Sequence, residues 1–67
     1  MLEIILNQKV LSVESGTTLE RLFDSLSVET KGCAVAIDNQ IVPRTHWHEF
    51  ELYNHVDINL FQAIAGG

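Results

Sequence analysis

The sequence predicts a small α+β roll, in which one helix covers one face of a mixed sheet of four to five strands. Two observations support this fold class. Short aliphatic and β-branched runs are separated by polar turns, and a single stretch, residues 17–26, has helical periodicity. The 67 residues suffice for one domain, residues 1–67. With a single helix, the other face of the sheet should remain uncovered.

The first two strands are expected at residues 2–6 and 10–13, joined by the polar turn Asn7-Gln8-Lys9 into an antiparallel hairpin. Side chains alternate between the two faces of a strand. Ile5 should therefore point away from the face that carries Leu2, Ile4 and Leu6. In the second strand, Leu11 and Val13 are placed inward.

A helix is expected next, over about residues 17–26. Thr17 and Glu20 have the spacing of a capping box, in which a hydroxyl and a carboxylate satisfy the first free backbone N–H groups. The apolar residues that follow at helical spacing are Leu19, Leu22, Phe23 and Leu26. They form one stripe that should face the sheet. Gly32 is expected to provide the turn that follows.

Three further strands complete the expected sheet. Residues 33–37 and 41–42 are joined by the turn Asp38-Asn39-Gln40, and Pro43 ends the second of them because proline cannot donate to a ladder. The irregular stretch that follows should cover one end of the core with Trp47, Phe50 and Leu52. Residues 56–62 alternate clearly, with Val56, Ile58 and Leu60 on one side and Asp57, Asn59 and Phe61 on the other. A right-handed crossover would place this last strand parallel to the first, in the middle of the sheet.

The composition excludes several classes of function. Nine acidic against four basic residues give a formal net charge of −5, which disfavours nucleic acid and favours partners with basic docking surfaces. No apolar run approaches the roughly 18 residues of a membrane span, and the first residues lack the basic start of a signal peptide. The single cysteine, Cys33, suits a reducing compartment. A cytoplasmic protein without a membrane segment is therefore expected.

No metal site and no catalytic residue are expected from the remaining polar side chains. His46 and His48 lack a second close pair of ligands, so their spacing matches no common zinc site. Cys33 lies in an apolar strand, where packing is a better explanation than nucleophilic reactivity. Glu49 and Glu51 flank an aromatic residue in an irregular stretch, so they are interpreted as solvated charges.

The carboxyl terminus is the most informative stretch. Residues 63–67 are expected to form an exposed, flexible tail, and a Gly-Gly end can enter a slot too narrow for side chains. The carboxylate of Gly67 is ionised at neutral pH, because such groups titrate at roughly 3.3 to 3.7. It becomes an electrophile only after activation, for example as an acyl-adenylate. The alternative is an ordinary frayed end.

Two motifs carry a resemblance to a known family. The motifs are Ile41-Val42-Pro43-Arg44-x-x-Trp47 and Asp57-Ile58-x-Leu60-Phe61-Gln62-x-Ile64-Ala65-Gly66-Gly67. Together with the hairpin, the capped helix and the length, they resemble the ThiS family of sulfur carriers in thiamin biosynthesis. The resemblance covers the whole chain and implies a β-grasp, ubiquitin-like fold.

The resemblance also implies a function as a carrier acted on by enzymes. A ThiF-type adenylyltransferase would use ATP and magnesium to adenylate the carboxylate of Gly67. A persulfide from a sulfur-donor enzyme would displace AMP and leave a thiocarboxylate, which a ThiG-type thiazole synthase would use. Gly66, Ala65 and Ile64 would present the reacting group. The protein would bind no cofactor of its own.

The chain departs from the family pattern in one turn. Relatives commonly carry a glycine before the last strand, where this chain has Tyr53-Asn54-His55. Asn54 is expected to take the left-handed turn position, because asparagine tolerates it better than most residues. The basic residue after the proline is present as Arg44, and both a structural role and a partner contact remain open for it.

The uncovered sheet face is the expected docking surface. Ile5, Ala34, Ala36 and Phe61 would form a shallow apolar patch beside the tail, with Arg44 as a further candidate contact. Alternatively, residues 44–53 fold over part of this face.

Two other functions stay open at this point. One is a carrier of another pathway, such as the small subunit of molybdopterin synthase or a ubiquitin-like modifier. The other is a non-catalytic interaction module with an incidental tail. A stand-alone enzyme is disfavoured, because no nucleophile, base and orienting group occur in a plausible combination.

Overall fold

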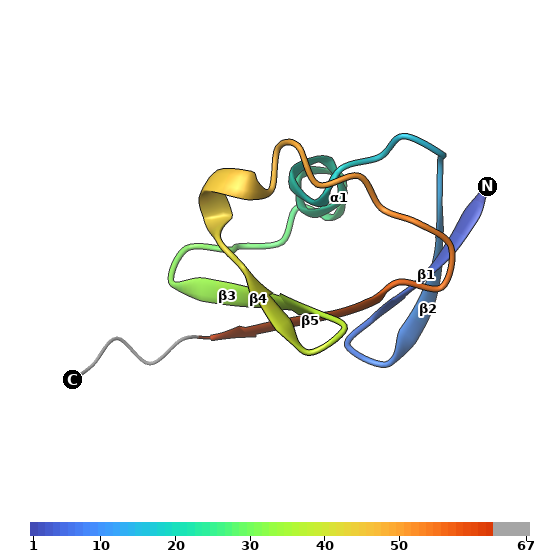
Figure 1. Cartoon of the computed structure of the whole chain (residues 1–67). Helices are drawn as coiled ribbons and strands as arrows, with labels where there is room; N and C mark the ends of the chain where they lie inside the picture. Colours follow the sequence, from blue (N-terminus) through green and yellow to red (C-terminus); the bar gives the residue numbers. More distant parts are fainter. Residues whose placement is uncertain (63–67) are drawn as a thin grey trace.

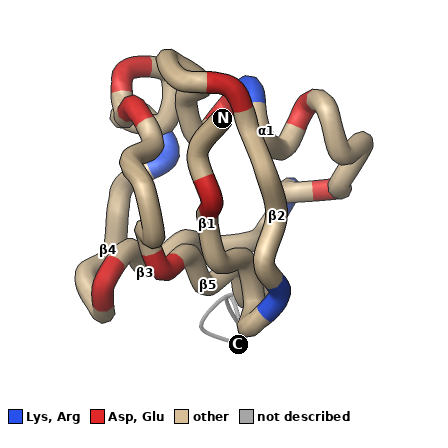
Figure 2. Tube along the Cα trace, turned by 90° about the vertical axis from the view of Figure 1, so that its right-hand side faces the viewer, with Lys and Arg blue, Asp and Glu red and all other residues tan. Residues whose placement is uncertain are grey.

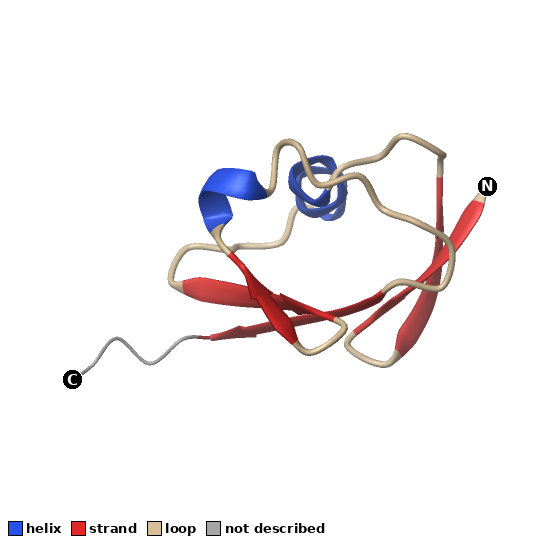
Figure 3. Ribbon diagram, in the orientation of Figure 1, coloured by secondary structure: helices blue, strands red, loops and turns tan. Residues whose placement is uncertain are grey.

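The computed structural model describes residues 1–62 and shows one sheet with one α-helix packed on one face (Figures 1 and 3). The elements are β1 (Leu2–Leu6), β2 (Lys9–Val13), α1 (Leu19–Leu26), β3 (Cys33–Ile37), β4 (Gln40–Val42), the 3-10 helix η1 (Arg44–His46) and β5 (Asp57–Gln62). The predicted fold class, a mixed sheet with one main helix, is confirmed. The predicted tail, residues 63–67, lies outside the described residues. Within residues 1–62, no helix is long and apolar enough to cross a membrane.

The strand order is β2-β1-β5-β3-β4, so the last strand occupies the centre of the sheet. It runs parallel to β1, where Ile5 lies opposite Asp57, and antiparallel to β3, where Val35 lies opposite Leu60. The expected central, parallel position of the last strand is therefore confirmed. Because β5 has neighbours on both sides, its first residues tie the two halves of the sheet together.

Both hairpins have two-residue turns, shorter than the three-residue turns predicted. The central residues are Asn7-Gln8 and Asp38-Asn39, with φ of 48° and 71° in each pair. Positive φ at both central positions is the signature of a type I′ turn, whose twist matches that of the flanking strands. Lys9 and Gln40, which were assigned to the turns, instead pair with the last residue of the preceding strand.

The helix begins one residue later than the capping box predicted. Thr18, not Thr17, is the N-cap, and its hydroxyl accepts a hydrogen bond from the backbone N–H of Arg21 at 3.3 Å. The backbone of Thr17 is used elsewhere: its carbonyl accepts from the N–H of Leu52 at 2.8 Å. This long-range bond holds Thr17 in an extended connection, so the helix can start only after Thr18.

The core lies between α1 and the sheet. Its ten buried hydrophobic residues are Ile4, Leu19, Leu22, Phe23, Val35, Ile37, Trp47, Leu52, Val56 and Ile58. The indole N–H of Trp47 donates to the carbonyl of Val42 at 3.0 Å, and its ring lies 5.3 Å from that of Phe23. Leu52 is buried and Phe50 is half-buried against the core. The prediction that this stretch covers one end of the core is confirmed.

The turn before β5 differs from the expectation. The residue with positive φ is His55, at 68°, and not Asn54. Asn54 instead uses its side chain, whose Oδ1 accepts from the backbone N–H of Glu3 at 3.0 Å. The N–H of His55 donates to the carbonyl of Glu3, so Asn54 and His55 together bond both backbone groups of Glu3 on β1. With both residues bonded to Glu3, the left-handed position falls on His55.

Candidate functional site

The sheet face opposite α1, here called the outer face, carries the residues predicted for docking. Paired residues of neighbouring strands share a face, and the register places Ala34 opposite Phe61 and Ala36 opposite Ile41. Phe61 is 43% exposed and Ile41 is 60% exposed. These four residues form one apolar patch on β5, β3 and β4, which we call the β3–β5 patch.

Ile5 lies on the same face but outside the β3–β5 patch. It is opposite Asp57 on β5 and opposite Val10 on β2. Asp57 and Asn59 project from β5 to the outer face, so polar side chains separate Ile5 from the patch. The structure therefore brings three of the four predicted apolar residues together and leaves Ile5 with Val10 in a second, smaller apolar pair.

Sequence reasoning missed Ile41 and Val10 as members of the outer face. Both are strongly exposed, at 60% and 63%. The signal that would have revealed them is the length of the two hairpin turns. A two-residue turn fixes the pairing register, and the register assigns Val10 to the face of Ile5 and Ile41 to the face of Ala36.

The segment between β4 and β5 leaves the outer face open. It crosses on the α1 side of the sheet (Figure 1). There the carbonyl of Phe50 accepts a hydrogen bond from the N–H of Leu19 at 3.0 Å, and the backbone of Glu51 forms an isolated antiparallel β-bridge with Thr18. The alternative that residues 44–53 fold over the outer face is therefore wrong.

Arg44 also belongs to the α1 side. Its guanidinium lies 4.4 Å from the ring centroid of Trp47. It donates to the hydroxyl of Thr30 at 3.1 Å and also to the carbonyl of Thr30. These contacts tie the connection before β3 to the start of η1, next to a shallow cavity of about 260 Å³. The structure thus gives Arg44 a structural role and places it apart from the β3–β5 patch.

The strand that leads toward the carboxyl terminus is held on both sides. On the β3 side its pairing extends to Gln62, opposite Cys33. On the β1 side Asn7 makes two bonds: its N–H donates to the carbonyl of Ile58, and its Oδ1 accepts from the N–H of Leu60, both at 2.9 Å. The predicted site residues Ile64, Ala65, Gly66 and Gly67 follow in sequence and lie outside the described residues.

Acidic side chains mark the other end of the outer face. Glu3 on β1 and Asp57 at the start of β5 are exposed, and Asp38 lies in the β3–β4 turn. Figure 2 shows acidic residues on β1 and at the turn between β3 and β4. The hydroxyl of Tyr53 donates to the carboxylate of Asp38. That hydrogen bond, followed by burial and by the charge of Asp38, raises the pKa of the Tyr53 phenol. The face therefore combines an apolar patch near the end of β5 with negative charge at its start.

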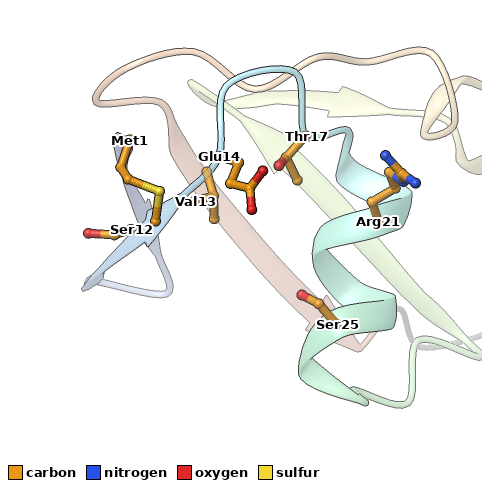
Figure 4. Close-up of a pocket in the computed structure, with 7 residues that line it drawn as sticks. All are labelled: Met1, Ser12, Val13, Glu14, Thr17, Arg21 and Ser25. Atoms are coloured by element: carbon orange, nitrogen blue, oxygen red, sulfur yellow. The ribbon is translucent and has the colours of Figure 1, made fainter.

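One open cavity lies beside the first residue of the chain and the start of α1. It is an open hollow of about 420 Å³ between the β1–β2 hairpin and α1 (Figure 4). Its lining consists of Met1, Ser12, Val13, Glu14, Thr17, Arg21 and Ser25. These side chains include neither a cysteine nor a histidine, so the cavity offers no thiol nucleophile and no imidazole base.

The other residues weighed in the sequence are dispersed over the surface. His46 lies 2.7 Å from Glu49 as an exposed pair, and Cys33 is half-buried with its Sγ 3.8 Å from the carbonyl of Glu29. Among residues 1–62, no group of three or more His, Cys, Asp or Glu side chains could hold a metal ion.

The family model described as "ThiS family" matches residues 2–67. The chain belongs to the ThiS family. A relative described as "Sulfur carrier protein ThiS", from Escherichia coli (strain K12), is 36% identical over 66 residues, which are 98% of this chain and 100% of the relative. The similarity thus extends over both chains from end to end.

A solved structure agrees with the fold. The crystal structure of a thiamine biosynthesis protein (ThiS) from Geobacter metallireducens superimposes with a TM-score of 0.86. It covers 98% of this chain and 100% of the other, at 14% sequence identity. At this identity the likeness shows the fold, and the fold is the β-grasp roll that the ThiS resemblance implied.

Proposed function

We propose that this ThiS family member is a sulfur carrier of thiamin biosynthesis and that the carboxylate of Gly67 is the group that carries the sulfur. The observation that supports this most directly is the family match, which runs through Gly66 to Gly67. The relative that is 36% identical is matched over its entire length and is named as a sulfur carrier, which supports the same function.

The chemistry proceeds in three steps. A carboxylate oxygen of Gly67 attacks the α-phosphorus of ATP, with magnesium bound to the nucleotide, and pyrophosphate leaves. The terminal sulfur of an enzyme-bound persulfide attacks the carbonyl carbon and displaces AMP, which gives an acyl disulfide. A second thiol reduces that disulfide and releases the thiocarboxylate, the sulfur source for a ThiG-type thiazole synthase.

The carrier itself supplies positioning and not acid–base chemistry. Bringing the carboxylate to the α-phosphorus is an entropic problem, and a rigid attachment reduces its cost. The paired strand β5 provides that attachment as far as Gln62, five residues before Gly67. Glycine at positions 66 and 67 would let the backbone pass a narrow channel of the adenylating enzyme.

We further propose that the β3–β5 patch is the docking surface for the ThiF-type adenylyltransferase and for the thiazole synthase. The patch adjoins the end of β5, its aromatic member is exposed, and the chain leaves it uncovered within residues 1–62. The acidic net charge of −5 favours a partner with a basic rim, which would speed the encounter.

The test is the intact mass of the protein after incubation with ATP, magnesium, the adenylyltransferase and a persulfide donor. We expect the increase that corresponds to replacing one oxygen by one sulfur, localised by fragmentation to Gly67. A variant lacking Gly67 serves as the control and should show no change. An unchanged mass for the intact protein, with adenylate formed on a positive-control carrier, would refute the proposal.

A further inference from the structure

Among the described residues, β5 pairs over five of its six residues with β3 but over only two with β1. On the β3 side, the register runs from Ile58 to Gln62. On the β1 side, it covers only Asp57 and Ile58. Figure 3 shows β5 continuing past the β1–β2 turn toward the carboxyl-terminal end, with β3 beside it. Within residues 1–62, the second half of β5 therefore has one edge without a neighbouring strand.

The direction of each backbone group on β5 follows from the bonds that are made. The carbonyl of Asp57 faces β3, because it accepts from the N–H of Asp38 at 3.0 Å. Backbone groups alternate along a strand, so those of residues 58, 60 and 62 face the β1 side. The bonds from Asn7 to Ile58 and from Leu60 to Asn7 agree with this assignment.

Asn7 satisfies only the first part of this edge. Its side-chain Oδ1 accepts a hydrogen bond from the N–H of Leu60, a bond that a backbone carbonyl would accept if the β1–β5 ladder continued. The next groups along the edge are the carbonyl of Leu60 and the N–H and carbonyl of Gln62. Within residues 1–62, these three groups have no hydrogen-bond partner. We call residues 60–62 on this side the β5 edge.

We propose that the β5 edge receives an extended segment of the protein that activates the carboxyl terminus, which adds to the sheet as a strand. Donors and acceptors that recur every second residue, about 7 Å apart, are matched best by another extended backbone. A ligand held by side chains alone would not need this repeat. The inference rests on the proposed function, because that function requires a protein to grip the chain close to Gly67.

The position of the edge favours this occupant over a second copy of the chain. Gln62 is five residues from Gly67, so even a fully extended connection spans at most about 18 Å. A strand added here would fix the backbone immediately before the reacting carboxylate, which is the positioning that adenylation requires. Phe61 of the β3–β5 patch lies between Leu60 and Gln62 in the same strand. An added strand could therefore bind the edge and contact the patch at once.

The test compares two substitutions of one residue. Gln62→Pro removes the N–H that faces the edge, and it leaves the β3 ladder intact because that N–H points away from β3. Gln62→Ala keeps the N–H and removes only the side chain. Binding to the ThiF-type adenylyltransferase is measured by calorimetry without ATP. We expect Gln62→Pro to bind about tenfold more weakly, the effect of one hydrogen bond, and Gln62→Ala to bind within about twofold of the natural protein.

A second measurement keeps the inference falsifiable if the proline disturbs the fold. A synthetic chain with an ester in place of the amide at Gln62 lacks the same N–H without changing φ, and it should show the same loss of affinity. In the natural protein, exchange of the Gln62 amide hydrogen should slow on binding. Equal affinity of the ester and the natural chain, or unchanged exchange in the complex, would overturn the inference. Absence of sulfur incorporation by the natural protein would refute the proposed function instead.

Discussion

Replacing His55 by glycine should stabilise the domain. His55 has φ of 68°, in the left-handed region that costs a residue with a Cβ about 1 to 2 kcal/mol. Glycine avoids this cost but loses about 0.5 to 1 kcal/mol more backbone entropy on folding. The imidazole lies 3.8 Å from the Glu3 carboxylate, with both side chains well exposed, so little is lost with it. The midpoints of the two ranges give a net gain of about 0.75 kcal/mol.

For a domain of this size, that gain corresponds to a rise of about 3 to 6 °C in Tm, measured by thermal unfolding followed by circular dichroism. Two matched variants separate the causes. His55→Ala removes the imidazole but keeps the Cβ, so its Tm should not rise. Asn54→Gly loses the hydrogen bond to the N–H of Glu3 at a residue without positive φ, so its Tm should fall. If His55→Gly lowered Tm, or if His55→Ala raised it equally, backbone strain would not be the explanation.

Three further predictions concern the core, the outer face and one phenol. Ile58→Ala removes a fully buried core side chain and should cost about 2 to 5 kcal/mol, checked by urea unfolding. Phe61→Asp should weaken adenylyltransferase binding while the domain stays folded, whereas Val28→Asp, also at an exposed apolar position, should leave binding unchanged; equal affinities would contradict the docking proposal. The raised pKa of Tyr53 means that its contribution to stability is complete below pH 10 and is lost as pH rises through the raised pKa. Asp38→Asn should lower the phenol titration midpoint in ultraviolet absorbance.

The fold was largely predictable because periodicity and topology rules act on the same elements. Alternation along residues 56–62 identified the core-facing side of the last strand, and the right-handed crossover rule gave its central position. The wrong predictions concerned the ends of helices and strands, because long-range hydrogen bonds determine where these elements begin and end. Thr17 satisfies the spacing of a capping box, yet its carbonyl is held by Leu52, which lies 35 residues later in the chain. Local sequence contains no signal for that bond.

The sequence predicted which residues face outward at the candidate site, but not which of them lie next to one another. Strand alternation placed Ala34, Ala36 and Phe61 on the uncovered face, since each side chain's face depends only on its own strand. Which of these residues touch depends on register between strands, and register was left open by turns assigned one residue too long. Ile5 was therefore grouped with residues from which Asp57 and Asn59 separate it. Arg44 could not be placed, because its partners Thr30 and Trp47 lie on different segments.

The inner face, the outer face and the free edge of β5 should respond differently to mutation. Ile58 is buried in the core and Leu60 packs against it, so substitutions at these two positions should change the free energy of unfolding. Phe61 faces outward in the β3–β5 patch, so its substitution should act mainly on partner affinity. The backbone of Leu60 to Gln62 forms the β5 edge, where removal of an N–H should act on binding although no side chain is altered. If only the side chains of β5 mattered, side-chain substitutions would change stability and partner affinity, but removal of a backbone N–H would not weaken binding.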